Sequence, residues 1–165
     1  MKNPEMPLNS TEEIQIDKYA LEAKLERLKE EQNLTLGVVG GIIGGILGAI
    51  IWAAITYFTD TKFGLVAIGV GFLVGCGVRL LGKGFDRVFG IVGAIIALLS
   101  IIIGNFLMAI GLLTKIVSLE YLEVLLTFDY TRTMELMTLI FSPMDLLFYG
   151  IAIYEGYRFS FRKIT

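Results

Sequence analysis

The 165-residue sequence contains no histidine and a single cysteine, and each shortage excludes classes of function. Without histidine the chain has no histidine general base, no histidine ligand for zinc or haem and no Ser-His-Asp triad. Cys76 alone forms neither an internal disulfide nor a structural zinc or iron–sulfur site. The net charge of −2 offers no basic surface to nucleic acid. We therefore expect a protein that is not an enzyme and has no cofactor, metal or nucleic-acid partner.

Charged residues are scarce in the middle of the chain. Of the 30 charged residues, 13 lie in positions 1–33 and only six in the next 79, while 55% of the whole sequence is hydrophobic. A water-soluble domain does not extend so far on so few charges, so the composition predicts an all-α membrane protein. Residues 1–33 carry eight acidic and five basic residues and no apolar core. We expect this segment not to be a cleavable signal peptide.

Three uncharged runs are candidate transmembrane helices. They are Gln32–Thr59, Phe63–Val78 and Val88–Thr114. The second run is short, but the flanking Lys62 and Arg79 can extend their charged ends to the headgroups. The predicted spans are 34–59, 63–82 and 88–113.

A fourth apolar stretch, Leu136–Tyr154, contains Asp145 and allows two interpretations. A helix through the whole stretch would place Asp145 near the membrane midplane, which is costly. Alternatively, Ser142 is the N-cap, Pro143 is the first helical residue and Asp145 completes a capping box. We favour the second interpretation, with a helix over 143–161.

Loop charges predict the orientation of a bundle of four transmembrane helices. The loop after the second helix and the C-terminal tail are basic, with Arg79, Lys83, Arg87, Arg158, Arg162 and Lys163. Residues 115–141 are acidic, with Glu120, Glu123, Asp129 and Glu135, and predict one or two short outer amphipathic helices. Both termini are therefore predicted to be cytoplasmic. Trp52, Tyr57 and Phe58 are predicted at the outer interface.

Glycines form the strongest pattern in the sequence. Small residues let membrane helices approach closely, and the first span carries them in two adjacent stripes with a four-residue repeat. The glycines predicted to pack helices are Gly37, Gly40, Gly41, Gly44, Gly45, Gly48, Gly71, Gly75 and Gly93. They could pack within one compact chain, or partly between protomers or against a larger partner; we favour the second interpretation.

Residues 1–33 predict a cytoplasmic amphipathic helix. The alternating four- and three-residue steps of a coiled coil are followed by Ile14, Lys18, Leu21, Leu25, Leu28 and Gln32, although Lys18 and Gln32 are poor core residues. The alternative is a single helix on the inner leaflet, although its acidic polar face disfavours anionic lipid. We favour helix association.

Three polar residues within the apolar region are candidate functional residues, namely Arg79, Asp145 and Glu155. Glu155 is expected to pair with Arg79 across helices or with Arg158 along its own helix. The alternative is a carboxylate that carries protons or ions. Asn105 and Ser100 are expected to form hydrogen bonds between helices.

The run AIGVGFLVGCGVRLLGKGFDRVFGIVGAIIALLSIIIGN at 67–105 and the segment DLLFYGIAIYEGY at 145–157 carry a family resemblance. They resemble uncharacterised bacterial membrane proteins with glycine-rich helices joined by a V-R-x-x-G-K-G hairpin. The resemblance covers residues 37–161. It implies a multi-pass protein of the bacterial inner membrane and brings no assigned activity or catalytic residue.

These observations predict a non-catalytic membrane protein. We expect it to self-associate, or to serve as a structural or accessory subunit of a larger membrane complex, through its glycine-faced helices. Its partners are then the lipid bilayer and a copy of itself or another membrane protein. The alternative is a small homo-oligomeric channel or ion-translocating protein.

Overall fold

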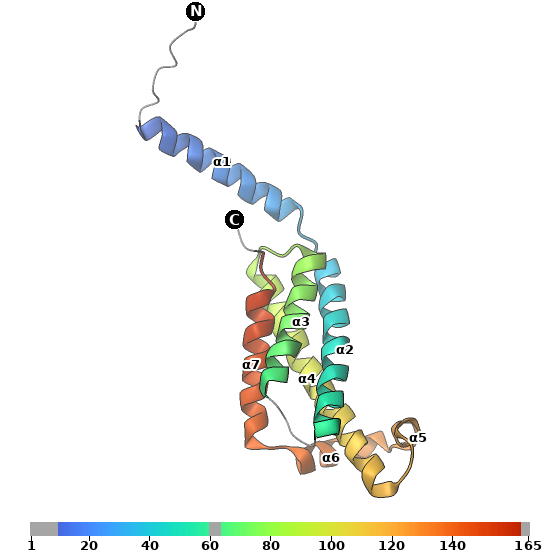
Figure 1. Ribbon diagram of the computed structural model, residues 1–165. Coiled ribbons are helices and arrows are strands. Elements are labelled where there is room, and N and C mark those ends of the chain that lie inside the picture. The colour runs from blue at the N-terminus through green and yellow to red at the C-terminus, as the bar shows by residue number, and fades with distance from the viewer. Residues whose placement is uncertain (1–9, 60–63, 163–165) are drawn as a thin grey trace, which may run out of the picture. The chain divides into compact units, whose positions relative to one another are not determined.

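The structure is a computed structural model that describes residues 10–59 and 64–162. Figure 1 shows that these residues form helices joined by short connections. The helices are α1 (Ser10–Glu30), α2 (Leu34–Thr59), α3 (Gly64–Gly82), α4 (Arg87–Val117), α5 (Tyr121–Thr127), the 3-10 helix η1 (Tyr130–Arg132), α6 (Thr133–Ile140) and α7 (Pro143–Phe159). The chain divides into two compact units, Met1–Gln32 and Asn33–Thr165. The predicted outer loop at 60–62 and Lys163 lie outside the described residues.

The first unit contains α1, the helix predicted for the N-terminal segment. Leu21 is exposed, whereas Leu25 and Leu28 are half-buried. Their spacing places the three leucines on one face of the helix. The side chain of Ile14 lies outside the described part. Both interpretations of this face, a coiled coil and a membrane-surface helix, stay predictions.

Three helices of the second unit are long and apolar enough to cross a membrane. Among the described residues these are α2, α3 and α4. A fourth crossing would need α7 and the preceding segment Tyr130–Ile140 to form one span together. The two are bent by 103° relative to each other. With 17 residues, α7 is about 25 Å long, somewhat less than the hydrocarbon thickness of about 30 Å. The protein is therefore helical, with three to four candidate membrane spans.

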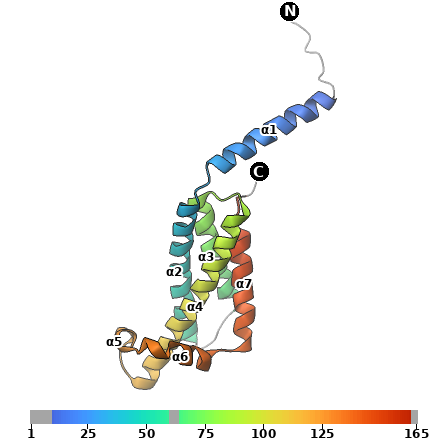
Figure 2. The same cartoon turned by 180° about the vertical axis from the view of Figure 1, so that it is seen from behind.

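Helices α2, α3, α4 and α7 lie side by side, as Figures 1 and 2 show. α2 and α4 run in one direction, and α3 and α7 run in the other. α3 packs against all three of the other helices, and so does α4. Within the described residues, α2 and α7 are diagonal neighbours that meet through side chains. The rings of Trp52 and Phe148 bridge this diagonal, with centroids 5.8 Å apart.

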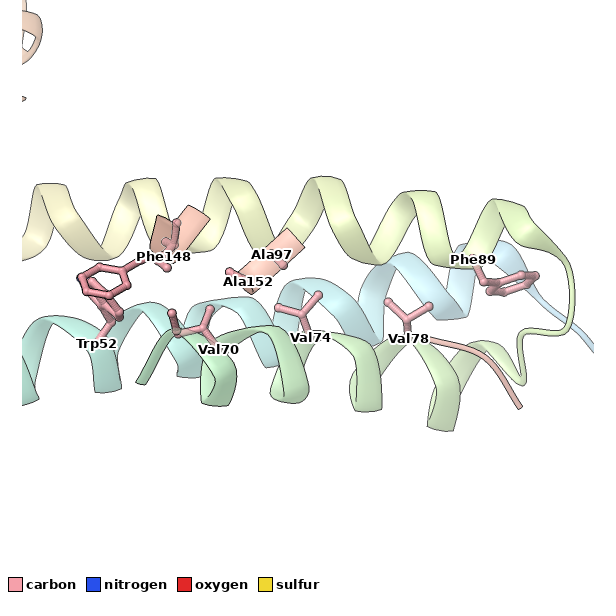
Figure 3. Close-up of a cluster of buried hydrophobic side chains, with 10 residues drawn as sticks. Trp52, Val70, Val74, Val78, Phe89, Ala97, Phe148 and Ala152 are labelled. Carbon is pink, nitrogen blue, oxygen red and sulfur yellow. The ribbon is translucent and has the colours of Figure 1, made fainter. Parts of the chain in front are cut away.

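The core of this unit is lined by small and β-branched side chains between the large residues at its two ends (Figure 3). Val70, Val74 and Val78 repeat every four residues along α3 and are fully buried. Trp52 and Phe148 fill one end, and Phe89 fills the other. The isoleucines and leucines on the outer faces of α2 and α4 are exposed.

The hairpin between α3 and α4 organises one end of the unit. Lys83 adopts a left-handed conformation with a φ of 50°, which turns the chain between the two helices. The Gly82 carbonyl accepts a hydrogen bond from the Asn33 N–H at 2.8 Å, just before α2. The Gly84 carbonyl accepts one from the Arg162 N–H at 2.8 Å, just after α7. The start of α2, the basic hairpin and the end of α7 therefore lie at the same end.

At the opposite end, α4 extends beyond the predicted span, to Val117. Ser118 then adopts a left-handed conformation with a φ of 56° and ends the helix. The Lys115 ammonium lies over the Tyr57 ring, 4.6 Å from its centroid, and donates to the Tyr57 carbonyl oxygen. The first short helix of the segment predicted at 115–141 is α5, which begins at Tyr121.

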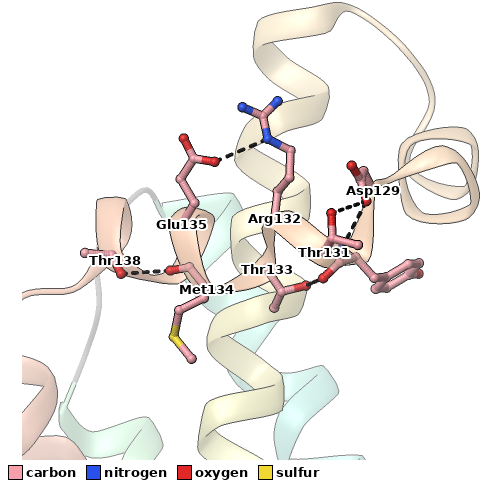
Figure 4. A network of polar contacts seen from close by, with 8 residues as sticks. Asp129, Thr131, Arg132, Thr133, Met134, Glu135 and Thr138 are labelled. Atoms are coloured by element: carbon pink, nitrogen blue, oxygen red, sulfur yellow. Dashed lines mark hydrogen bonds and ion pairs between the residues drawn. The ribbon is translucent and has the colours of Figure 1, made fainter.

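The outer segment contains α5, η1 and α6, and Figure 4 shows the local polar contacts in η1 and α6. Asp129 caps η1 by accepting hydrogen bonds from the N–H and the hydroxyl of Thr131, at 3.1 and 2.7 Å. Both bonds lower the pKa of Asp129 below its usual value, and the bond from the Thr131 hydroxyl has the larger effect. Arg132 and Glu135 form an exposed ion pair at 3.2 Å. Two short α-helices, with a 3-10 helix between them, thus form where one or two short helices were predicted.

The start of α7 distinguishes the two interpretations of the fourth apolar stretch. The hydroxyl of Ser142 accepts from the Met144 N–H, and the carboxylate of Asp145 accepts from the Ser142 N–H at 2.9 Å. Pro143 occupies the first turn. This is the predicted capping box, so the alternative interpretation, one continuous helix over 136–154, is wrong. The chain bends at Ser142 because this residue is both the N-cap of α7 and the residue before a proline. Each of these positions favours an extended rather than a helical backbone conformation.

Candidate functional site

The two glycine stripes of α2 face two different helices of the same chain. A Cβ at Gly40 would collide with the carbonyl oxygen of Gly77 on α3, and one at Gly44 would lie 2.8 Å from the Leu73 carbonyl carbon. On the other stripe, a Cβ at Gly41 would lie 2.7 Å from an Ile96 methyl of α4. Backbone therefore contacts backbone along α2 and α3, which is the close approach that glycine permits.

The remaining predicted packing glycines are covered in the same way. Gly45 faces Ser100, Gly48 faces Val70, and Gly37 faces Phe89. A Cβ at Gly75 would lie 2.6 Å from the Phe159 Cβ on α7, and a Cβ at Gly93 would collide with the Ser160 hydroxyl. Gly71 faces α7 at Ala152 and Glu155. All nine glycines therefore pack within one chain, and their stripes offer no free surface for another molecule.

Two other glycines have open space where a side chain would be. No atom lies within 4 Å of a Cβ built at Gly69 on α3 or at Gly150 on α7. Gly69 borders a groove of about 340 Å³ against α2. Gly150 borders a groove of about 410 Å³ between α7 and Ile68 of α3. Neither glycine belongs to the predicted packing set, and Gly150 has no glycine partner at helical spacing.

Glu155 is half-buried beside the groove at Gly150 and lies at mid-height of the helices. A Cβ at Gly71 would lie 2.8 Å from the Glu155 Cβ. Gly71 is about 10 Å along α3 from Gly64 and about 16 Å from Gly82. Arg79 is about 12 Å further along α3. Glu155 therefore lies beside the middle of α3. An ion pair with Arg79 would require Glu155 to lie nearer the end of α3.

The predicted ion pairs of Glu155 are not formed. In the part of the chain that the structure describes, Glu155 forms no ion pair with Arg79 or with Arg158. The Arg158 guanidinium instead lies 5.9 Å from the centroids of the Tyr154 and Phe159 rings. α7 is parallel to α3 but displaced along it, which separates Glu155 from Arg79.

A second polar group joins three helices through hydrogen bonds. The indole N–H of Trp52 on α2 donates to Oδ1 of Asn105 on α4 at 2.9 Å. The Nδ2 of Asn105 donates to the hydroxyl of Tyr149 on α7 at 2.9 Å. The interhelical bonds predicted for Asn105 are confirmed. Ser100 instead donates to the Ile96 carbonyl of its own helix at 2.7 Å, so the prediction for Ser100 is wrong.

Asp145 lies beside this group, at the floor of a cavity of about 260 Å³ between α4, α6 and α7. Its side chain is 1% exposed. The cavity is lined by Asn105, Met134, Met137, Thr138, Ile140, Phe141, Asp145 and Tyr149. The structure therefore places Asp145 among polar and apolar groups at the end of the helices opposite the basic hairpin.

The chemistry available at these sites is hydrogen bonding and charge. Within the described residues, no group of three His, Cys, Asp or Glu side chains lies close enough to hold a metal ion. Cys76 is a half-buried thiol on α3. Two carboxylates each line a cavity or groove of these helices: Asp145 lines the cavity between α4, α6 and α7, and Glu155 lines the groove at Gly150.

A comparison with protein-family models, with curated proteins and with solved structures found no match to this chain. The resemblance to bacterial membrane proteins with a V-R-x-x-G-K-G hairpin stays a prediction, which residues 67–105 and 145–157 carry.

Proposed function

We propose that the protein is a multi-pass membrane protein that crosses the bilayer four times, with α7 as the fourth span. The start of α2, the hairpin and the end of α7 lie at one end, with Lys83, Arg87 and Arg162. The other end carries Glu120, Glu123, Asp129 and Glu135. The positive-inside rule makes the basic end cytoplasmic, with both termini on that side. The location in a bacterial inner membrane rests on the family resemblance.

Within that membrane the protein acts as a non-catalytic structural subunit that self-associates through the outer face of α7. The observation that carries this proposal is the position of Glu155, a half-buried carboxylate at mid-height beside the open Gly150. A carboxylate in contact with lipid is costly, so such residues normally face protein or water. A helix of another molecule in the groove over Gly150 would replace lipid with protein next to Glu155.

The occupant that fits this groove is a second copy of the chain. Two copies related by a two-fold axis along the membrane normal present the same residues at the same depth. Arg158 is exposed one turn beyond Glu155, and its stem can reach along a neighbouring helix. Each Glu155 can then pair with Arg158 of the other copy, which gives two equivalent ion pairs away from water. Gly150 provides the close approach of the two α7 helices.

The open glycines allow a direct test. Gly150→Leu inserts a bulky side chain into the proposed interface, and Gly69→Leu inserts the same side chain into the groove on the other side of α3. Neither residue has an atom within 4 Å of its Cβ position, so the packing of the single chain is kept in both variants. We expect Gly150→Leu to shift the detergent-solubilised protein from dimer to monomer, and Gly69→Leu to leave the dimer intact. Sedimentation equilibrium or mass photometry gives the mass.

Crosslinking in native membranes provides an independent measurement. In a Cys76→Ser background, Gly150→Cys is expected to form a disulfide-linked dimer, and Gly69→Cys is expected to stay monomeric. A monomeric wild-type protein in mild detergent, together with no crosslink at position 150, would contradict self-association through α7. An intact dimer in Gly150→Leu would place the interface elsewhere.

The same carboxylate supports a second candidate function, proton or ion translocation by an oligomer. Its mid-height position in an open groove is the observation that favours it, because ionisable groups at that depth mark ion pathways in transporters. Reconstituted liposomes would show proton or cation flux with wild type and background flux with Glu155→Gln. Equal background flux in both would remove this candidate.

A further inference from the structure

We propose that the short helix α5 is a membrane anchor whose apolar face is embedded among the acyl chains of the outer leaflet. This inference rests on the membrane spans proposed above, and it concerns a different surface from the groove at Gly150. The apolar face of α5 consists of Leu122, Leu125 and Leu126. Leu125 is half-buried, but Leu122 is 68% and Leu126 is 80% exposed. Two leucines this exposed, one turn apart on a seven-residue helix, favour a position against an apolar medium.

The other residues of α5 divide into a packed face and a polar face. Val124 is buried, and the hydroxyl of Tyr121 donates to the Leu107 carbonyl of α4 at 2.9 Å, so this face packs on α4. Glu123 and Thr127 are exposed and lie one turn apart on a third face. The exposed surface of α5 is therefore divided between an apolar side and a polar side. Helices that lie in the membrane interface show this division, with the apolar side toward the acyl chains.

The position of α5 along α4 corresponds to the outer boundary of the hydrocarbon. Figures 1 and 2 show α5 beside the last turns of α4. Leu107, which accepts the bond from Tyr121, is about 30 Å along α4 from Arg87 at the basic end, and the hydrocarbon core is about 30 Å thick. Beyond Leu107, α4 continues for about 15 Å to Val117, and the chain then turns back at Ser118. α5 therefore begins beside the membrane boundary and not beyond the end of α4.

Aromatic contacts hold the chain after α5 at the same depth. The ring of Phe128 packs against Phe106 of α4, with centroids 5.8 Å apart, and the Tyr130 ring lies 6.1 Å from the same ring. The hydroxyl of Tyr130 donates to the Leu125 carbonyl at 2.7 Å. Phe106 precedes Leu107 in the sequence, so both ends of α5 are tied to adjacent residues of α4. Tyrosine side chains are enriched at the head-group level of membrane proteins, which agrees with this depth.

The surface beside α5 is apolar and continuous with the proposed spans. A groove of about 300 Å³ lies between α2, α4 and Tyr121. It is lined by Ile50, Ala53, Ala54, Tyr57, Leu107 and Tyr121. Ile50 is exposed on the outer face of α2, so lipid that surrounds α2 and α4 also reaches α5. Because Glu120 and Glu123 flank the apolar face, contact with acyl chains, and not attraction to anionic head groups, holds α5 in the membrane.

Nitroxide labels on single cysteines test the depth of α5. The full-length protein, in a Cys76→Ser background and in phosphatidylcholine nanodiscs, carries one label on the apolar face or on the polar face of α5. The apolar positions are Leu122→Cys and Leu126→Cys, and the matched polar positions are Glu123→Cys and Thr127→Cys. All four residues are exposed, so the packing of the chain is kept. Collisions with oxygen, which concentrates in lipid, are compared with collisions with a water-soluble nickel chelate. We expect the ratio of oxygen to nickel collisions to be several-fold higher on the apolar face.

Three results are distinguishable for the label at position 126. Frequent collision with oxygen and rare collision with nickel supports contact with acyl chains. Frequent collision with nickel would show that the apolar face is in water. Rare collision with both would show that protein, such as a second copy of the chain, covers it. Either of the last two results would overturn the anchor, and so would equal ratios at all four positions of α5.

A label at Ile95→Cys separates this inference from the proposed spans. Ile95 is exposed and lies about 12 Å along α4 from Arg87, inside the proposed hydrocarbon region. We expect this label to collide with oxygen and only rarely with nickel. If it does so while the label at position 126 contacts water, the anchor is refuted and the spans stand. Water contact at Ile95 would contradict both proposals.

Discussion

The indole nitrogen of Trp52 donates to the side-chain oxygen of Asn105 across 2.9 Å, although the residues are 53 positions apart in sequence. Asn105 passes the connection on to Tyr149, so one amide side chain joins α2, α4 and α7. Asn105 and Trp52 are fully buried. α2 and α7 do not pack backbone to backbone in the described residues, so this hydrogen-bonded group fixes the diagonal of the bundle.

Asn105→Leu is expected to destabilise the bundle. The substitution keeps the volume but leaves the buried indole N–H of Trp52 without an acceptor, at a cost of about 1–3 kcal/mol. Tyr149→Phe removes only the bond to the Tyr149 hydroxyl, and interhelical hydrogen bonds in membranes average about 0.6 kcal/mol. Unfolding in sodium dodecyl sulfate, followed by Trp52 emission, gives both values. Wild-type stability of Asn105→Leu would show that the bond to Trp52 contributes nothing.

The space around two glycines predicts opposite effects on stability when each is replaced by alanine. Gly40→Ala would force a methyl group against the Gly77 carbonyl, which cannot move without shifting α3, and overpacking of this kind costs about 1–3 kcal/mol. Gly69→Ala enters open space and gains helix propensity, up to about 1 kcal/mol. The melting temperatures of the two variants in one detergent test the difference. Wild-type stability of Gly40→Ala would contradict the contact between Gly40 and the Gly77 carbonyl.

Much of this fold is encoded in local sequence patterns. The uncharged runs predict helices that begin or end close to the observed Leu34, Thr59 and Gly82. The capping box at Ser142 is a short-range signal, because its residues contact each other within one turn. The four-residue glycine repeat correctly marks faces that pack closely. A repeat of this kind carries no information on the identity of the packed partner, which is why an interface between protomers was favoured for glycines that pack within the chain.

The features that sequence reasoning missed depend on how the helices are aligned. The sequence predicts an ion pair between Glu155 and Arg79, but α7 is displaced along α3 and Glu155 lies beside Gly71. The position of Trp52 at the outer interface stays a prediction, but its burial is not evident from the sequence, because the acceptor for its indole N–H is Asn105 on another helix. Gly150 follows no repeat, so its open groove becomes evident only when neighbouring helices are in place.

The pKa of Asp129 predicts a pH dependence for the outer segment. Hydrogen bonds from Thr131 lower this pKa in the folded state, so the ionised carboxylate stabilises η1 at a pH above the usual value for aspartate. This contribution is lost as the pH falls through the lowered folded-state pKa. We expect faster amide hydrogen exchange at Thr131 at acidic pH, after correction for the intrinsic rate. In Asp129→Asn the same amide should show no such step, and a step that persists there would assign the effect to another group.

Ser142→Ala is expected to loosen the first turn of α7. The substitution removes the hydroxyl that accepts the Met144 N–H, and loss of a serine N-cap costs about 1 kcal/mol. The Asp145 carboxylate keeps its bond to the backbone N–H of residue 142, so half of the capping box survives. Ser142→Asn should retain most of the stability, because asparagine is an equally good N-cap. Hydrogen exchange at Met144 and the melting temperature measure the effect, with Thr138→Ala as a control in α6, where the hydroxyl bonds only to its own helix. Equal protection of Met144 in wild type and Ser142→Ala would mean that Pro143 and Asp145 fix the start of α7 without the serine.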